Sequence, residues 1–249
     1  MKRSVPILLY HHVSPERDIT PMGFEVQLRS LLDEGYEALS MNSLAQVISG
    51  KKTVTKLSFA VTFDDGYQDN VQHAFPVLQK LAIPAMIYLV TEKIGTEGFL
   101  SWTDIRTMAA SGLVTYGSHT HTHRHFVRRE PYQKLEEELY KSKALIEGEL
   151  KTSCEHLAWP WGDYETEWLP LVKKLGYATA ATTLSGANAE GTNSYELRRI
   201  NIRRPSADQL LSRLKWNAFS APASAFGLFY GWDRRFKVWW NKESPYSHG

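Results

Sequence analysis

The chain has 249 residues, of which 43% are hydrophobic and 22% charged, which suits one large or two small globular domains with a sizeable core. Its net charge of +2 is too small to indicate a nucleic-acid partner, and its single cysteine, Cys154, excludes an internal disulfide. No stretch reaches the roughly 18 apolar residues of a transmembrane helix, and no signal peptide is visible, so we expect a cytoplasmic protein, in solution or at the inner face of the membrane.

Short apolar runs alternate with helix-like patterns along the chain. Strands are predicted, in chain order, at residues 6–10, 57–63, 85–90, 113–116, 156–159, 177–181 and 200–202. Helices are predicted between them at residues 20–35, 70–81, 103–110, 131–149 and 167–175. The first helix has Thr20 and Pro21 as its cap and first turn, and Gly35 as its end. Repeated strand–helix units predict a parallel sheet, either open or closed into a barrel.

The chemically distinctive stretches follow the predicted strands. They read YHH at 10–12, FDDGY at 63–67, GSHTHTH at 117–123 and WPWGDY at 159–164. Ligand sites in barrels and doubly wound sheets lie at the carboxyl ends of the strands. We therefore expect these segments to lie close together, at the end of the sheet or barrel where the strands have their carboxyl ends.

Two adjacent carboxylates, Asp64 and Asp65, end the second strand, and Gly66 allows a sharp turn after them. If strand geometry continues, the two side chains point in different directions, so one can hold a metal while the other faces a substrate. By themselves they fit a turn with local hydrogen bonds better.

Four histidines lie within seven residues of GSHTHTHRHF at 117–126. His119 and His123 are four apart and would share one face of a helical turn. With one carboxylate they would form an open, catalytic type of metal site; its nitrogen and oxygen ligands suit zinc best, and also cobalt or nickel. His121 and His125 are not expected to be ligands. The alternative is a solvated loop without a metal.

These residues resemble the motifs of the polysaccharide deacetylases of carbohydrate esterase family 4, the NodB-homology domain. TFDDGY at 62–67 is similar to the first motif, SHTHTH at 118–123 to the second and WPWG at 159–162 to the third. YHHV at 10–13 and LRRINI at 197–202 resemble strands of the branch that includes poly-β-1,6-N-acetylglucosamine deacetylases. The resemblance runs from about residue 5 to 205.

The resemblance implies an α/β fold, a distorted (β/α)7 barrel, which we assign to residues 1–215. It implies a divalent metal held by Asp65, His119 and His123, with Asp64 as the catalytic base. The reaction would remove N-acetyl groups from N-acetylhexosamine units of a polysaccharide or glycoconjugate, with water activated by the metal as the nucleophile. A backbone N–H near Tyr67 would help to stabilise the oxyanion.

The sequence departs from the family at the general acid. The family's late Leu-x-His motif is missing, and Ala158 stands where the third motif often has an arginine. His11, at the end of the first strand, is the candidate acid, or else a structural cap; His12 is expected to face away. Arg199 is assigned to the substrate-binding group and could take over part of the missing arginine's role, or form a surface salt bridge.

Aromatic residues suggest where a substrate binds. Tyr67 and Trp161 are the substrate-binding candidates, Trp161 as a lip residue between Pro160 and Gly162. Residues 216–249 form an aromatic and basic extension, and residues 225–240 mix both types in a way that suits peripheral membrane contact and a lipid-linked glycan. The extension could instead pack on the barrel or form an oligomer contact.

Two other functions fit the same residues. One is a relative that hydrolyses another amide, such as a formamide or a small cyclic amide. The other is a non-catalytic glycan-binding or metal-binding protein on the same barrel, which the missing late histidine favours. The retained Asp64, Asp65, His119 and His123 favour the deacetylase.

Overall fold

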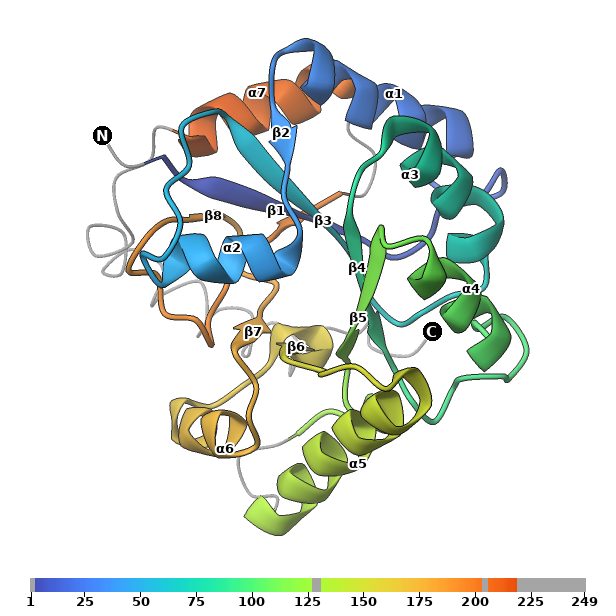
Figure 1. The fold of residues 1–249 in the computed structure, drawn as a ribbon, viewed down its shortest axis with the longest axis vertical. Helices are drawn as coiled ribbons and strands as arrows, with labels where there is room; N and C mark the ends of the chain where they lie inside the picture. The colour runs from blue at the N-terminus through green and yellow to red at the C-terminus, as the bar shows by residue number, and fades with distance from the viewer. Residues whose placement is uncertain (1–2, 127–130, 203–205, 219–249) are drawn as a thin grey trace, which may run out of the picture. The chain divides into compact units, whose positions relative to one another are not determined.

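The computed structural model describes residues 3–126, 131–202 and 206–218, all within one compact unit. Figure 1 shows a curled sheet with helices around its outside. The strands are β1 (Val5–Tyr10), β2 (Glu37–Ala38), β3 (Ser58–Phe63), β4 (Ala85–Leu89), β5 (Val114–Ser118), β6 (His156–Ala158), β7 (Thr179–Ala181), β8 (Ala187–Asn188) and β9 (Ile200–Asn201). The helices are α1 (Pro21–Asp33), α2 (Met41–Ile48), α3 (Phe75–Leu81), α4 (Trp102–Ala110), α5 (Tyr132–Leu150), α6 (Leu169–Lys174) and α7 (Ala207–Ala218).

The sheet is mostly parallel and runs in the order β7-β6-β5-β4-β3-β1, with β9 parallel and β8 antiparallel to β1. A single parallel bridge between Ala181 and Leu197 links the end of β7 to the segment that leads into β9. Backbone hydrogen bonds from Leu197 to Ala180 and from Thr182 to Leu197 support this bridge. The two sides of the sheet thus approach each other, which gives the predicted distorted barrel.

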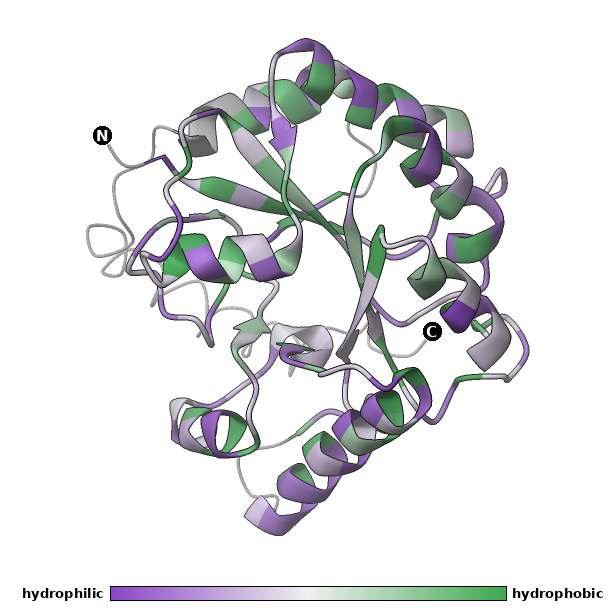
Figure 2. Cartoon of the chain, in the orientation of Figure 1, coloured by the Kyte–Doolittle hydropathy of each residue, from purple (hydrophilic) through white to green (hydrophobic). Residues whose placement is uncertain are grey.

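Burial explains why the central strands form. Every residue of β1 and β3 is buried, as expected for parallel strands covered on both faces. Figure 2 shows apolar residues along these strands, whereas α1 and α5 carry both apolar and hydrophilic residues. In α5 the buried side chains recur every three or four residues, at Leu135, Leu139, Ser142 and Ile146, so one face of the helix packs on the sheet.

The predicted main strands and helices are all present, and the cap of the first helix is confirmed, because Thr20 Oγ1 accepts the Gly23 N–H at 3.1 Å. The helix predicted over 70–81 is instead a π-helical segment, Asn70–Ala74, followed by α3. The sequence did not predict α2, α7 or the two-residue strands β2 and β8, which are too short to show a period of two.

None of the helices in the described part of the chain is long and apolar enough to cross a membrane. The segment 225–240 and most of the predicted extension 216–249 lie outside the described residues.

Candidate active site

The two carboxylates at the end of β3 both lie near His119: Asp64 Oδ2 is 3.8 Å and Asp65 Oδ1 3.6 Å from its Nε2 atom. Asp64 continues the pairing with β1, since its N–H bonds the Tyr10 carbonyl at 3.0 Å, and its side chain is buried. Asp65 has a φ of 74° and Gly66 a φ of 77°, so the chain leaves the strand abruptly in left-handed geometry. Asp65 therefore belongs to this turn, whereas Asp64 still pairs with β1.

Asp65, His119 and His123 form a compact ligand cluster, each with one ligand atom within 4.8 Å of the others. The Asp65 Oδ1 atom is 3.3 Å from His123 Nε2 and 3.6 Å from His119 Nε2. The His119 Nδ1 atom lies 2.8 Å from the Ala158 carbonyl, which can only accept, so the proton is on Nδ1 and the Nε2 lone pair faces the cluster. These donors can hold one divalent ion.

The expected helical turn between His119 and His123 is wrong. Residues after β5 form an irregular turn in which Thr120 and His123 have φ values of 66° and 56°. Thr120 Oγ1 accepts the His123 N–H at 3.1 Å, which closes the turn on itself. Left-handed geometry is unfavourable for residues other than glycine, so the surrounding structure must hold this turn.

Glu138 of α5 supplies part of that support. Its Oε2 atom accepts the backbone N–H groups of His121 at 2.9 Å and Thr122 at 2.8 Å, and its Oε1 accepts the Thr122 hydroxyl at 2.8 Å. One turn further along α5, Ser142 Oγ lies 2.6 Å from Ser118 Oγ. Two side chains on one face of α5 therefore fix both ends of the turn that runs from Ser118 to His123, which we call the ligand turn.

The other two histidines of the motif are outside the cluster, as predicted. His121 Nδ1 lies 2.9 Å from the Thr91 hydroxyl. His125 stacks on Trp161, with ring centroids 4.6 Å apart, and its Nδ1 is 3.4 Å from Asp163 Oδ2. Each therefore stabilises the surroundings of the site.

Arg199 pairs with Asp64 inside the protein. Its Nη1 and Nη2 atoms donate to the two Asp64 oxygens at 2.6 and 2.7 Å, and its Nε donates to the Thr182 carbonyl at 2.8 Å. Burial acts to raise the pKa of Asp64, but the Arg199 charge, the hydrogen bonds from Arg199 and the nearby histidines together outweigh it, and the pKa falls to about 2. The Arg199 side chain is fully buried, so it lies behind the Asp64 carboxylate, in neither a surface salt bridge nor the substrate-facing wall.

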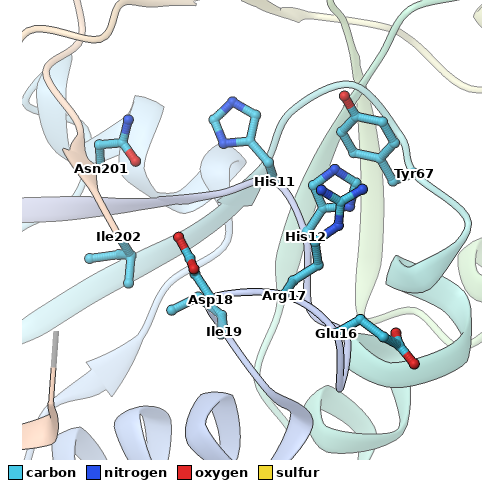
Figure 3. A pocket seen from close by; sticks show the side chains of 9 residues that line it. All are labelled: His11, His12, Glu16, Arg17, Asp18, Ile19, Tyr67, Asn201 and Ile202. Carbon is cyan, nitrogen blue, oxygen red and sulfur yellow. The ribbon is translucent and has the colours of Figure 1, made fainter. Parts of the chain in front are cut away.

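His11 lines an open pocket of about 450 Å³ (Figure 3). Its pKa is lowered, chiefly by burial; Asp64 and Asp65 oppose this, and Arg199 and His119 add to it. His12 was expected to face away, but it lines the same pocket as His11. Strand alternation does not extend to it, because β1 ends at Tyr10.

The aromatic residues near the site differ in exposure. Trp161 is 57% exposed, and its ring centroid lies 5.2 Å from that of His123. It is therefore at the rim of the site, beside His123. Trp159 and Tyr164 are buried core residues. Tyr67 lines the pocket, and burial together with the Asp65 charge raises its pKa to about 12, so its hydroxyl stays protonated at neutral pH.

Sequence comparison identifies the relatives of this chain. The model of the polysaccharide deacetylase family matches residues 51–180. The protein YxkH of Bacillus subtilis (strain 168), whose name assigns it provisionally to the polysaccharide deacetylases, is 30% identical over 200 residues, which cover 80% of this chain and 71% of the relative. The poly-β-1,6-N-acetyl-D-glucosamine N-deacetylase of Staphylococcus aureus (strain MRSA252) is 25% identical over 208 residues, covering 79% and 71%.

Solved structures agree with this relationship. The Streptococcus pyogenes deacetylase PplD, in complex with acetate, matches with a TM-score of 0.79 and 26% identity, covering 86% of this chain and 99% of that one. IcaB from Ammonifex degensii matches with a TM-score of 0.79 and 24% identity, covering 86% and 98%, and supports the fold. The chain therefore belongs to the polysaccharide deacetylase family, hydrolases that act on N-acetyl amide bonds.

Proposed function

We propose that this protein is a divalent-metal-dependent N-deacetylase that removes acetyl groups from N-acetylglucosamine units of a polysaccharide. The observation that carries the proposal is the pairing of a ligand cluster, Asp65, His119 and His123, with a separate carboxylate, Asp64, that has its own buried partner. The name of the S. aureus relative supports N-acetylglucosamine as the sugar.

The donor set favours zinc. Two imidazoles and one carboxylate leave coordination positions open, and the Ala158 carbonyl fixes the tautomer of His119 for ligation through Nε2. Cobalt or nickel would suit the same donors. A bound divalent ion supplies Lewis-acid polarisation of the acetamide carbonyl and makes water a stronger nucleophile.

The remaining chemistry is assigned to the chain's own side chains. Asp64 is the base that takes the proton from the attacking water, and Arg199 holds its carboxylate in one orientation by two parallel hydrogen bonds. His11 delivers a proton to the leaving nitrogen, which needs one to depart as an amine. Because burial lowers the pKa of His11, its imidazole is neutral at rest, and the proton that it delivers is the one that Asp64 has taken from water.

The protonated Tyr67 and the exposed Trp161 are the proposed substrate contacts. The Tyr67 hydroxyl can donate a hydrogen bond beside Asp65, and the Trp161 ring offers an apolar face to the C–H groups of a sugar at the rim of the site. Arg199, which was grouped with them, is instead a positioning residue for Asp64.

Acetate release from β-1,6-linked N-acetylglucosamine oligomers tests the proposal. We expect release by the zinc-loaded protein, loss of release after chelation, and recovery on adding zinc. Formate release from N-formyl compounds without acetate release would favour the alternative amide hydrolase. Oligomer binding without release of either acid would favour the non-catalytic glycan-binding alternative.

A location at the cytoplasmic face of the membrane, with a lipid-linked glycan as substrate, is a separate proposal. It rests on the aromatic and basic composition of residues 225–240. Cosedimentation with anionic liposomes should be reduced by deleting residues 225–249, and unchanged cosedimentation would contradict it.

A further inference from the structure

We propose that the pocket beside His11 is a sugar subsite, which binds the pyranose next to the one being deacetylated, and that His12 is its main hydrogen-bonding residue. This inference rests on the proposed function and extends it, because it makes an oligosaccharide a better substrate than a monosaccharide. The pocket is lined by His11, His12, Glu16, Arg17, Asp18, Ile19, Tyr67, Asn201 and Ile202.

The pocket shares two lining residues, His11 and Tyr67, with the proposed catalytic and substrate-binding groups. His11 and Tyr67 form part of its wall, and the Asp65 charge acts on the pKa values of both side chains. Figure 3 shows these two residues on one side of the pocket, with residues 16–19 and 201–202 around the rest of it. A glycan whose acetamide reaches the ligand cluster past His11 would therefore place an adjoining sugar in this space.

His12 is held in one orientation by two independent contacts. Its Nδ1 atom lies 2.6 Å from Asp69 Oδ2, and its ring stacks on Tyr67 with centroids 3.8 Å apart. The other face of Tyr67 stacks on Phe99 at 5.0 Å, so His12 is the last ring of a three-ring stack. Since the Asp69 carboxylate accepts from Nδ1–H, the Nε2 atom remains for a hydrogen bond with a ligand hydroxyl.

The same segment also positions the proposed acid. Asp69 Oδ1 accepts from Asn70 Nδ2 at 2.8 Å, and Asn70 Nδ2 lies 3.0 Å from the His11 carbonyl. Both residues lie at the start of the π-helical segment that follows the two catalytic carboxylates, and such segments are frequent at functional sites. Asp69 and Asn70 thus tie the orientation of His12 to the position of His11.

The lining suits a neutral sugar better than an ion. Glu16, Arg17 and Asp18 bring charges of both signs, Asn201 adds an amide, and Ile202 adds an apolar surface. A pyranose ring presents hydroxyl groups at its edge and C–H groups on its faces, which match such a mixture. The volume of about 450 Å³ falls in the range of small-molecule sites.

The test compares binding of a β-1,6-linked N-acetylglucosamine tetrasaccharide with that of the monosaccharide. Binding is measured by ligand-observed NMR titration to zinc-loaded Asp64→Asn protein, with and without His12→Phe, so that no turnover is needed. His12→Phe keeps an aromatic ring on Tyr67 and removes both ring nitrogens. The matched control is His73→Phe, the same substitution at a half-buried histidine of the π-helical segment that does not line the pocket.

We expect His12→Phe to weaken tetrasaccharide binding by about threefold to tenfold, the range of one uncharged hydrogen bond, and to leave monosaccharide binding and zinc affinity unchanged. His73→Phe should leave the binding of both sugars unchanged. Equal losses for both sugars, or no loss for either, would overturn the subsite. Failure of the Asp64→Asn protein to bind the tetrasaccharide would also overturn it, whereas acetate release by the wild-type protein decides the proposed function separately.

Discussion

The guanidinium of Arg199 and the carboxylate of Asp64 form a bidentate pair that is almost completely shielded from solvent, with N–O distances of 2.6 and 2.7 Å. Family members often supply an arginine from the third motif, where this chain has Ala158. Here the backbone carbonyl of Ala158 orients His119, and the arginine comes from the segment just before β9. The Asp64 carboxylate is thus positioned by a residue that lies 135 positions further along the sequence.

Replacing Arg199 with methionine should leave the Asp64 carboxylate buried without its partner. We expect the metal-free variant to lose about 3–5 kcal/mol of unfolding free energy at pH 7, as for other broken buried ion pairs. The pH dependence of the Asp64 contribution to the unfolding free energy should also reverse in sign. In the wild-type protein the pKa of Asp64 is lowered to about 2, so its contribution is present above the unfolded value and is lost as pH falls.

In Arg199→Met, burial alone would raise the pKa of Asp64 above its unfolded value, so this contribution would be lost as pH rises. Urea unfolding between pH 3 and pH 8 measures both slopes. Arg198→Met, a partly exposed neighbour, serves as the control and should cost under about 1 kcal/mol. An Arg199→Met protein as stable as this control would contradict the assignment.

Glu138 should control metal affinity without touching the metal. Glu138→Ala removes the acceptor of two backbone N–H groups in the strained ligand turn, so we expect zinc affinity to fall by about 10–100-fold. Glu138→Gln retains an acceptor oxygen and should recover most of the affinity. Competition with a chromophoric chelator measures the change, and Glu137→Ala on the exposed face of α5 is the control. Wild-type affinity in Glu138→Ala would mean that the turn holds itself.

His156 should make the fold sensitive to mild acid. It is buried between Asn42 and Thr179, and burial lowers its pKa to about 4. The unfolded chain therefore takes up this proton first as pH falls below about 6.5, and stability falls with it. Relative to pH 7, the unfolding free energy at pH 5 should drop by about 2 kcal/mol through this residue.

The measurement is urea unfolding of the wild-type protein and His156→Gln at both pH values. The variant should show a drop smaller by about that amount, although its stability at pH 7 can also be lower. Equal drops in the two proteins would show that His156 is not the group responsible.

Two substitutions of Trp161 should distinguish the cost of backbone strain from the loss of a substrate contact. Its φ of 61° is unfavourable for any residue with a Cβ atom, and its ring is mostly exposed. Trp161→Gly should therefore be about 1 kcal/mol more stable than Trp161→Ala, because glycine relieves the strain. Both variants lack the ring and should show the same reduced kcat/KM on an oligomer. Equal stabilities would show that the turn relaxes in the variants.

The sequence predicted the parts of the site that lie next to strands. The ends of β1, β3 and β5 were placed closely enough to bring His11, Asp64 and His119 to one mouth, because parallel strands end at one edge of a sheet. The helical turn for His119 and His123 was wrong because the Glu138 carboxylate stabilises an irregular turn that four-residue spacing cannot indicate.

Residues that act from a distance were harder to predict. Glu138 is one of several glutamates on an amphipathic helix, and nothing in its spacing marks it as a partner of the ligand turn. The Arg199–Asp64 pair joins residues 135 positions apart, so only the closing of the barrel brings them together. His12 was assigned to the wrong side because alternation was extended past the last residue of β1.

We propose that the two adjacent aspartates have different roles, Asp65 as a metal ligand and Asp64 as the base. The most direct test measures zinc content and acetate release on the same preparations of Asp64→Asn and Asp65→Asn, each checked for folding by circular dichroism. We predict that Asp64→Asn keeps its zinc and loses activity by about 10²–10⁴-fold, the size of general-base effects, whereas Asp65→Asn loses both. Full acetate release by Asp64→Asn, or full zinc content in Asp65→Asn, would contradict the account.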